Sequence, residues 1–463
     1  MSRRAAGAAL MAAALSSGCM SLAPTYERPA APVPASFAGD TAAAGPVDGE
    51  LAWQEFFGDA RMKALIGIAL ANNRDLRIAA LNIAQARATV DLRRADLLPT
   101  VGAGVSASRQ PRAGDGIDSL YSAGLSVTAY ELDFFGRIRN VGDAAAARYL
   151  STEEARKTAQ ISLVASVAST YLALRADEAL LEVTRQTLVT REESLKLTKL
   201  KFDHGAASEI DFRQAESLYE TARAALAQQT RQRALDENAL VLLLGQGLPP
   251  ELPPGLPLTD QRMVADLPAG LPSELLVRRP DVRAAEQQLV AAHADIGAAR
   301  AAFFPRITLT GSVGSASTEL SGLFRGGSLA WTVAPQALVA IFDAGRNRAN
   351  LDVAKVGREI ALAQYERAIQ SAFREVADAL AGRATLVEQL RAQQAQARAE
   401  EVRHRLADLR YRNGAASYLD VLDAQRAEFA AQQALVQTQL QQAQNLVAVY
   451  KALGGGWTEA AAR

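Results

Sequence analysis

The chain carries the same series of landmarks twice, once in each half. Pro99 recurs 206 residues later as Pro305, and Gly136 recurs 209 residues later as Gly345. Self-similarity at a nearly constant spacing marks a duplicated structural unit. The spacing grows between the prolines and the glycines, so we expect the extra residues to lie in a loop between two strands.

The most similar segments of the two halves are 202–208, which reads FDHGAAS, and 411–417, which reads YRNGAAS. Each lies between two long stretches without proline, so we predict two helical hairpins that reverse at the glycines. The serine that ends each segment is placed to cap the following helix. The predicted turns comprise Gly205, Ala206, Ala207 and Ser208 in the first half and Gly414, Ala415, Ala416 and Ser417 in the second.

The helices predicted on either side of these turns are unusually long. Residues 141–202 and 347–411 contain no proline, and at 1.5 Å per residue each would span on the order of 95 Å. Shorter helices are predicted over 73–97 and 209–244, which together would match one long helix in length. Apolar residues seven positions apart predict lengthwise packing of coiled-coil type. In the last helix these are Leu422, Phe429, Val436, Ala443 and Tyr450.

Four strands are predicted between the prolines and the glycines of the two halves. Apolar residues there alternate with small polar ones over 101–108, 121–129, 307–313 and 328–333. Alternation with period two is typical of a strand with one face in lipid and the other in water, although strands of a soluble sandwich can show it too. Pro99 and Pro305 would mark the change from helix to strand, and Gly136 and Gly345 the change back.

Four strands are too few to close a sheet on themselves. An open strand edge is not tolerated in lipid, because each backbone polar group there must be bonded. Closure therefore requires further copies, and three copies would give a 12-stranded trimeric β-barrel. The predicted fold class is mainly helical with a membrane β part: a duplicated helix-strand-strand-helix repeat and a long helical coiled-coil barrel.

The first 34 residues have the pattern of an exported, lipid-anchored protein. Two arginines precede the apolar residues 5–15, and Cys19, the single cysteine, follows small residues. This pattern predicts a signal peptide over 1–18 and acylation of Cys19, although an incidental cysteine after ordinary cleavage would look the same. The absence of aspartate at Met20 and Ser21 favours the outer membrane. The prolines of 24–34 predict an extended tether.

Charge and residue chemistry exclude several classes of function. The 50 Lys and Arg balance the 50 Asp and Glu, which argues against a nucleic-acid surface. His204, His293 and His404 lack metal-ligand spacing, and we expect all three to be solvated. The sequence contains no phosphate-binding loop and no nucleophile elbow. We therefore predict no catalytic residues, no metal and no cofactor, and a protein that is not an enzyme.

Several motifs together resemble a known family. They include WQEFFGD at 53–59, YELDFFGR at 130–137, RRPDV at 278–282, IFDAGR at 341–346 and LDVLDAQ at 419–425. This set is similar to the outer-membrane factors of the TolC and OprM type, and most closely to the efflux lipoproteins called NodT-type. The resemblance extends over essentially the whole chain.

The resemblance implies a homotrimer with a large periplasmic portion, anchored in outer-membrane lipid. It implies a periplasmic membrane-fusion adaptor that docks at the hairpin turns, and an inner-membrane pump of the resistance-nodulation-division class. The chain would then conduct small molecules such as drugs passively to the outside. Two alternatives stay open: the channel of a type I protein secretion system, or a lipid-anchored periplasmic coiled-coil adaptor.

The resemblance also suggests where the periplasmic aperture would close. Some members carry an acidic residue just after the turn glycine, where this chain has alanines. Asp211 and Asp420, about one turn further on, are the candidate gate residues, together with Arg410 and Arg412. Three copies of one aspartate could form a cation-selective ring. The alternative is that these carboxylates pair with helix N-termini or with neighbouring arginines.

The landmarks divide the chain into six predicted parts. These are the signal peptide over 1–18, a lipidated tether over 19–52, a first repeat over 53–247, a proline-rich linker over 248–272, a second repeat over 273–455 and a tail over 456–463.

Overall fold

The computed structural model describes residues 21–34, 36–37, 51–112, 114, 116–264 and 278–457. The predicted signal peptide and Cys19 lie outside these residues, as do most of 35–50, residues 265–277 and the last six residues. The chain forms two compact units, and each takes residues from both halves of the sequence. The first unit comprises Leu81–Glu154, Arg283–Ala368 and the described part of Met1–Ala30, and the second comprises Ala155–Val282, Ile369–Arg463 and Ala31–Ala80, again in their described parts.

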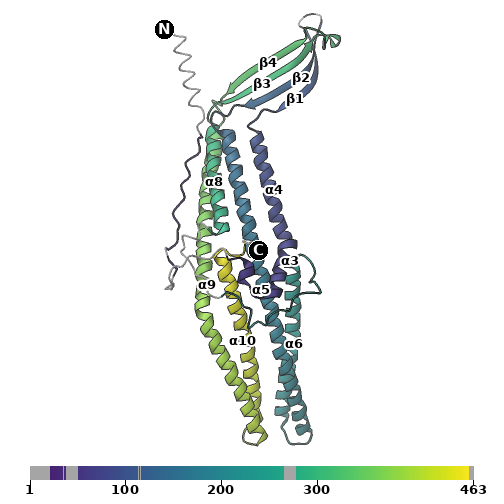
Figure 1. The fold of residues 1–463 in the computed structure, drawn as a ribbon, viewed down its shortest axis with the longest axis vertical. Coiled ribbons are helices and arrows are strands. Elements are labelled where there is room, and N and C mark those ends of the chain that lie inside the picture. The colour runs from purple at the N-terminus through teal and green to yellow at the C-terminus, as the bar shows by residue number, and fades with distance from the viewer. Residues whose placement is uncertain are drawn as a thin grey trace. The chain divides into compact units, whose positions relative to one another are not determined.

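The two halves use the same order of elements, which confirms the predicted duplicated helix-strand-strand-helix plan (Figure 1). Two short helices, α2 (Trp53–Phe56) and α3 (Ala60–Asn72), precede the first half. The first half contains α4 (Arg74–Ala95), β1 (Val101–Pro111), β2 (Ile117–Glu131), α5 (Arg137–Asp203) and α6 (Glu209–Leu244). The second contains α8 (Pro280–Ala301), β3 (Arg306–Ser317), β4 (Leu329–Leu338), α9 (Arg346–Arg412) and α10 (Tyr418–Ala452).

The corresponding long helices are equal in length, since α5 and α9 have 67 residues each. The difference between the halves lies in the connection of their strands. The link between β3 and β4 is longer than that between β1 and β2 and contains a short 3₁₀ helix, Leu320–Gly322. The change of spacing from 206 to 209 residues therefore falls in the strand region, as predicted from the sequence.

The four strands form one antiparallel sheet in the order β1-β2-β3-β4 (Figure 1). Leu125 of β2 lies opposite Val313 of β3, which in turn lies opposite Trp331 of β4. Because side chains alternate between the two faces of a strand, these residues share one apolar face. The other face is small and polar, with hydroxyl hydrogen bonds between Ser106 and Ser122, and between Ser312 and Thr332.

A β-bulge interrupts this alternation near the end of β2. The register with β3 shifts between Val127 and Tyr130, and Ala129 adopts a positive φ of 52°. The predicted alternation through Ala129 was therefore wrong beyond Val127, because a bulge adds one residue to one strand. The shift places Glu131 on the polar face, where its carboxylate lies 2.6 Å from the Arg306 guanidinium and 2.8 Å from that of Arg137.

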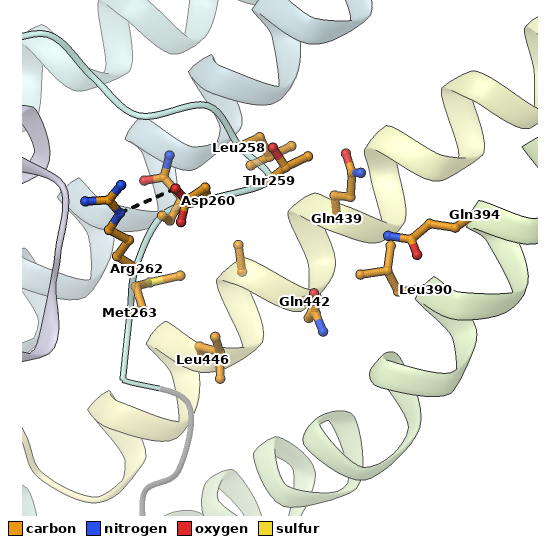
Figure 2. Close-up of a pocket in the computed structure, with 12 residues that line it drawn as sticks. Leu258, Thr259, Asp260, Arg262, Met263, Leu390, Gln394, Gln439, Gln442 and Leu446 are labelled. Carbon is orange, nitrogen blue, oxygen red and sulfur yellow. Dashed lines mark hydrogen bonds and ion pairs between the residues drawn. The ribbon is translucent and has the colours of Figure 1, made fainter.

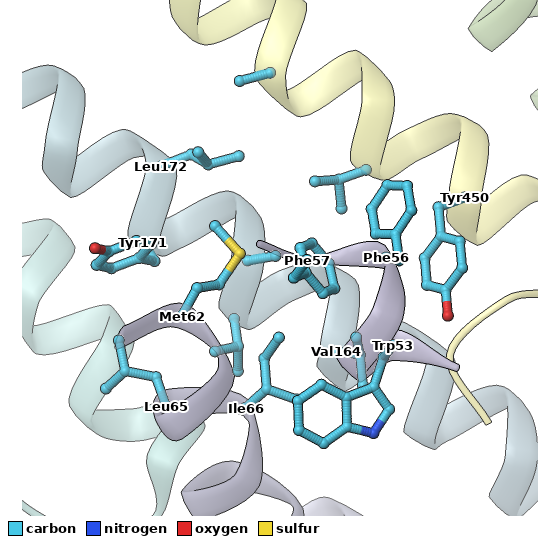
Figure 3. Packing of buried hydrophobic residues seen from close by; sticks show 14 of the residues in the cluster. Trp53, Phe56, Phe57, Met62, Leu65, Ile66, Val164, Tyr171, Leu172 and Tyr450 are labelled. Atoms are coloured by element: carbon cyan, nitrogen blue, oxygen red, sulfur yellow. The ribbon is translucent and has the colours of Figure 1, made fainter. Parts of the chain in front are cut away.

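The hydrophobic core of the second unit is built around an aromatic cluster (Figure 3). Phe56 stacks on Tyr450 of α10 with their ring centroids 4.1 Å apart. The fully buried Asp59 caps α3 by accepting hydrogen bonds from the backbone of Arg61 and Met62. The other oxygen of Asp59 accepts from the Tyr171 hydroxyl at 3.0 Å. A buried carboxylate with this many donors holds α3 against α5.

The heptad stripe predicted in the last helix is confirmed as core. All five of its members are at most 8% exposed in α10, namely Leu422, Phe429, Val436, Ala443 and Tyr450. Their burial shows that α10 packs along its length, as apolar residues of this spacing do. Among the described residues, none of the helices combines the length and the apolar character needed to cross a membrane.

In the first unit, the beginning of the described chain lies along α8. Arg300 donates to the backbone oxygen of Leu22 at 3.0 Å. Two further contacts follow along α8, each about two turns from the one before: the rings of Tyr26 and His293 meet edge to face, and Arg28 forms two hydrogen bonds with Glu286. Residues 21–28 of the predicted tether are therefore held against α8 by polar side chains. The prolines of this segment predicted an extended chain but not this contact.

Candidate functional site: the two hairpin turns

The two hairpin turns have the same backbone geometry. Gly205 and Gly414 both adopt a φ of 71°, in the left-handed region that favours glycine. In each turn the following alanine donates back to the helix: Ala206 to the Lys201 oxygen at 2.7 Å and Ala415 to the Arg410 oxygen at 2.8 Å. These bonds satisfy carbonyls at the helix end that would otherwise lack partners.

The serines and aspartates after the glycines form two matching capping boxes. Ser208 accepts a hydrogen bond from the Asp211 backbone while the Asp211 carboxylate accepts from the Ser208 backbone. Ser417 and Asp420 repeat the same pair of bonds at the start of α10. The candidate gate carboxylates therefore each satisfy a helix N-terminus, which is the alternative that the sequence left open.

The arginines proposed for the gate make other contacts. Arg410 donates to the Ala415 backbone oxygen at 3.2 Å, and Arg412 pairs with Asp408 one turn earlier at 2.9 Å. Asp420 and both arginines are exposed, whereas Asp211 is half-buried. The fold thus brings the four predicted gate residues to the two turns but pairs none of the arginines with either aspartate among the residues described.

Next to the turns, side chains link the first hairpin to the second. The Lys201 ammonium on α5 lies 2.8 Å from the Tyr411 hydroxyl on α9 and 4.6 Å from the centre of its ring. Tyr411 lies 5.2 Å from Tyr418, measured between ring centroids. The Tyr418 hydroxyl in turn bonds Ser194 of α5 at 2.5 Å. Sequence reasoning missed this link because its members come from three separate helices.

The residues predicted at the changes between helix and strand lie where the elements meet. Pro99 and Pro305 lie between a helix end and a strand start, two and one residues before β1 and β3. Gly136 and Gly345 directly precede α5 and α9, with φ values of 72° and 85°. A residue with a side chain would be strained at these φ values.

Two of the three histidines differ from the prediction that they are solvated. His404 of α9 is partly buried, and its Nδ1 lies 2.6 Å from a carboxylate oxygen of Glu428 on α10. His293 packs against Tyr26, and burial lowers its pKa below the usual range. Only His204, in the first turn, is exposed. The prediction failed because a helix face rich in Gln and Arg can still be covered by another part of the chain, an extended segment for His293 and α10 for His404.

A cavity of about 220 Å³ lies between the 258–263 loop and helices α9 and α10 (Figure 2). Gln439 and Gln442 of α10 and Gln394 of α9 line it, with Leu446 at one end. Arg262, on the loop, pairs with Asp260 at 3.4 Å. The rest of the lining is a mixture of apolar side chains and glutamine amides, and its one carboxylate, Asp260, is the partner of Arg262.

A carboxyl pair lies between α5 and α6, away from the turns. Asp177 is 7% exposed and shares a hydrogen bond with Asp236. Burial, together with that hydrogen bond and the nearby negative charge, raises the pKa of Asp177 to about 7. Two carboxyl groups this close hold one proton between them.

The comparisons with known proteins agree with this geometry. The family model described as outer membrane efflux protein matches residues 65–246 and 271–455. The toluene efflux pump outer membrane protein TtgI of Pseudomonas putida is 48% identical over 461 residues, which cover 97% of this chain and 98% of that protein. OprJ of Pseudomonas aeruginosa is 44% identical over 99% of this chain and 98% of its own length.

Among solved structures, the open state of the Neisseria gonorrhoeae MtrE outer membrane channel matches with a TM-score of 0.87 and 42% identity. The match covers 95% of this chain and 99% of that one. A second match, the Campylobacter jejuni CmeC outer membrane channel, has a TM-score of 0.86 at 25% identity, over 96% of both chains. This chain belongs to the outer membrane efflux protein family.

Proposed function

We propose that three copies of this chain form the exit channel of a tripartite efflux pump, which conducts small apolar or amphiphilic molecules out of the periplasm. The outer-membrane location and the efflux role follow from family membership. The closure by three copies, the docking partners and the cargo are our proposals.

The two-faced sheet is the observation that carries this proposal. Its apolar face exposes Val105, Leu329 and Trp331, each more than 70% accessible in the single chain. Its outer strands β1 and β4 have no further strand partner among the described residues. A sheet edge in lipid must be paired, and three such sheets joined edge to edge would form a closed sheet of twelve strands.

The hairpin turns are the proposed docking site for a periplasmic adaptor that connects the channel to an inner-membrane pump. Gly205, Ala206, Gly414 and Ala415 are all exposed, and small side chains there leave the backbone open to a partner. Asp420, one turn away, is the residue we propose for a carboxylate ring at the aperture. Cys19 is the proposed site of the lipid anchor.

The cargo is inferred from the relatives, of which several are named as toluene or solvent efflux pump components. The chain is therefore proposed to serve small-molecule efflux rather than type I protein secretion. The four-stranded sheet with an exposed apolar face argues against a purely periplasmic adaptor, since nothing in such a protein would cover that face.

Deletion of the gene, with plasmid complementation, tests the proposal. We expect the deletion strain to become more sensitive to a panel of antibiotics, dyes, detergents and toluene, and the wild-type gene to restore resistance. The complemented strain should contain a heat-modifiable trimer in its outer membrane. A soluble monomer in the periplasm, or unchanged sensitivity to every compound, would rule the proposed channel out.

A further inference from the structure

A second cavity, of about 270 Å³, lies between α5 and α10, with His404 of α9 at its side. All of its lining residues belong to the second unit, and those from α5 precede the first turn by more than ten residues in the sequence. Most of its lining is polar, and it contains one strongly cationic group, the Arg191 guanidinium of α5. Neither the proposed channel function nor the family comparison gives this cavity a role.

Arg191 is buried in an unusual way for an arginine. The residue is 2% exposed. Its Nη1 donates to the Leu218 backbone oxygen of α6 at 2.9 Å, and its guanidinium carbon lies 4.9 Å from the centre of the Phe429 ring. Its Nε has no hydrogen-bond partner. One edge of the guanidinium, formed by Nε and Nη2, is therefore free of protein partners in the part of the chain that the structure describes.

The positive charge of Arg191 also lacks a balancing negative charge. No described carboxylate forms an ion pair with it, and burial together with the nearby Arg426 lowers its pKa from the usual range. Glu428 also lines the cavity, but its oxygens are taken up by His404 at 2.6 Å and by Gln432 at 3.1 Å. A buried charge without a counter-charge is strongly unfavourable, so a missing anion is expected.

We propose that the cavity binds a small free carboxylate, held by the Nε–Nη2 edge of Arg191. That edge presents two parallel N–H groups, which match the two oxygens of a carboxylate in a bidentate pair. The side-chain amide of Gln425, 7% exposed and with an unpaired Oε1, lies in the same lining. Rotated by half a turn, it would offer its NH₂ group to the bound carboxylate.

Binding at this place would join the two hairpins. Arg191 already contacts α6 through Leu218 and α10 through Phe429. A carboxylate that neutralises the guanidinium would stabilise this three-helix contact, since a ligand that binds only the folded state raises its stability. This inference does not depend on the channel proposal, because it concerns a site within one chain.

The test measures binding of ¹³C-labelled acetate to the purified full-length protein in detergent, by saturation-transfer NMR, together with thermal unfolding at increasing acetate concentration. The wild-type protein should show a saturable acetate signal and an unfolding temperature that rises with acetate. The neutral analogue acetamide should produce neither effect.

Three variants assign the effect to Arg191. Arg191→Met removes the charge and should abolish both the signal and the acetate-dependent rise, and it should fold, since replacement of an unpaired buried charge by an apolar side chain of similar size is tolerated. Arg191→Lys keeps the charge without the planar fork and should bind acetate more weakly. Arg185→Met removes an exposed arginine of the same helix and should behave as wild type.

Two results would overturn the proposal. One is an acetate response in Arg191→Met equal to that of the wild type. The other is a wild-type protein whose unfolding temperature and NMR signal do not respond to acetate, which would make Arg191 a structural residue only.

Discussion

The Lys201 ammonium lies 2.8 Å from the Tyr411 hydroxyl oxygen and 4.6 Å from the centre of the Tyr411 ring, so one lysine makes both a hydrogen bond and a cation–π contact. This pair joins α5 of the first hairpin to α9 of the second close to both turns. A contact of this kind contributes about 0.5–2 kcal/mol. It is therefore strong enough to bias the hairpins towards one arrangement, and weak enough to be broken by a docking partner.

Removal of this link should favour an open aperture. We expect Lys201→Met to raise the single-channel conductance or the open fraction in planar bilayers, and Tyr411→Phe, which keeps the ring, to have a smaller effect. Lys199→Met is the matched control, because Lys199 pairs with Asp203 of its own helix at 3.0 Å. Equal conductance in all four proteins would show that the pair does not restrain the hairpins.

At the second turn, two substitutions distinguish the structural role of the capping box from the effect of the Asp420 charge on the channel. Ser417→Ala removes the cap and should destabilise α10 by about 1 kcal/mol. Asp420→Asn keeps a hydrogen-bond acceptor but removes the charge, so it should change the reversal potential in asymmetric salt if a carboxylate ring exists. Thermal unfolding and bilayer recordings of both variants provide the measurement. An Asp420→Asn channel with wild-type cation selectivity would remove Asp420 from the gate.

A single added lysine should impair assembly on the apolar face of the sheet and be tolerated on the other face. Val333 lies on the apolar face of β4 and is 61% exposed in the single chain, while its neighbour Ala334 lies on the other face. A lysine facing lipid costs about 2–4 kcal/mol at the bilayer midplane. We therefore expect Val333→Lys to lower the yield of heat-modifiable trimer in the outer membrane and Ala334→Lys to assemble normally. Equal yields would place both residues in water.

The Asp177 and Asp236 pair predicts a pH dependence of stability. The pKa of Asp177 is raised to about 7 in the folded protein from a usual value of 3.8. A group whose pKa is raised by folding stabilises the protein fully below its unfolded pKa, and this contribution is lost as the pH rises through the folded pKa. The unfolding free energy should therefore fall between pH 5 and pH 8.

Asp177→Asn should flatten this dependence and raise stability at pH 8, because the amide carries no charge to bury. Chemical unfolding at several pH values measures both effects. Asp143→Asn serves as the control, since Asp143 lies on the same helix and is exposed. The shared proton would be contradicted if the wild-type protein gained stability between pH 5 and pH 8 and Asp177→Asn showed the same pH dependence.

Much of the fold could be predicted because its signals are local. The glycines at the turns, the serine caps and the strand alternation each depend on residues close together in the chain, and the duplication follows from the recurrence of these local signals in the second half. Gly205 and Gly414 are recognisable because a left-handed φ excludes most side chains. The buried stripe of α10 from Leu422 to Tyr450 could likewise be predicted, since heptad spacing alone defines one helix face.

Other features were decided only by the tertiary structure. The bulge before Glu131 places that carboxylate beside Arg306, a partner 175 residues away, and no local pattern distinguishes it from a regular strand. His404 was predicted to be solvated and instead meets Glu428 on another helix.

The sequence by itself determined which segments become helices, strands and turns, because those choices depend on propensity, periodicity and backbone sterics within a few residues. The tertiary structure alone decided which charges are buried and what they meet. Arg191 and Asp177 are ordinary charged residues in a helical sequence, and their surroundings exist only once α6 and α10 have packed against α5. Burial and pairing are properties of that packing, since they depend on atoms supplied by distant parts of the chain.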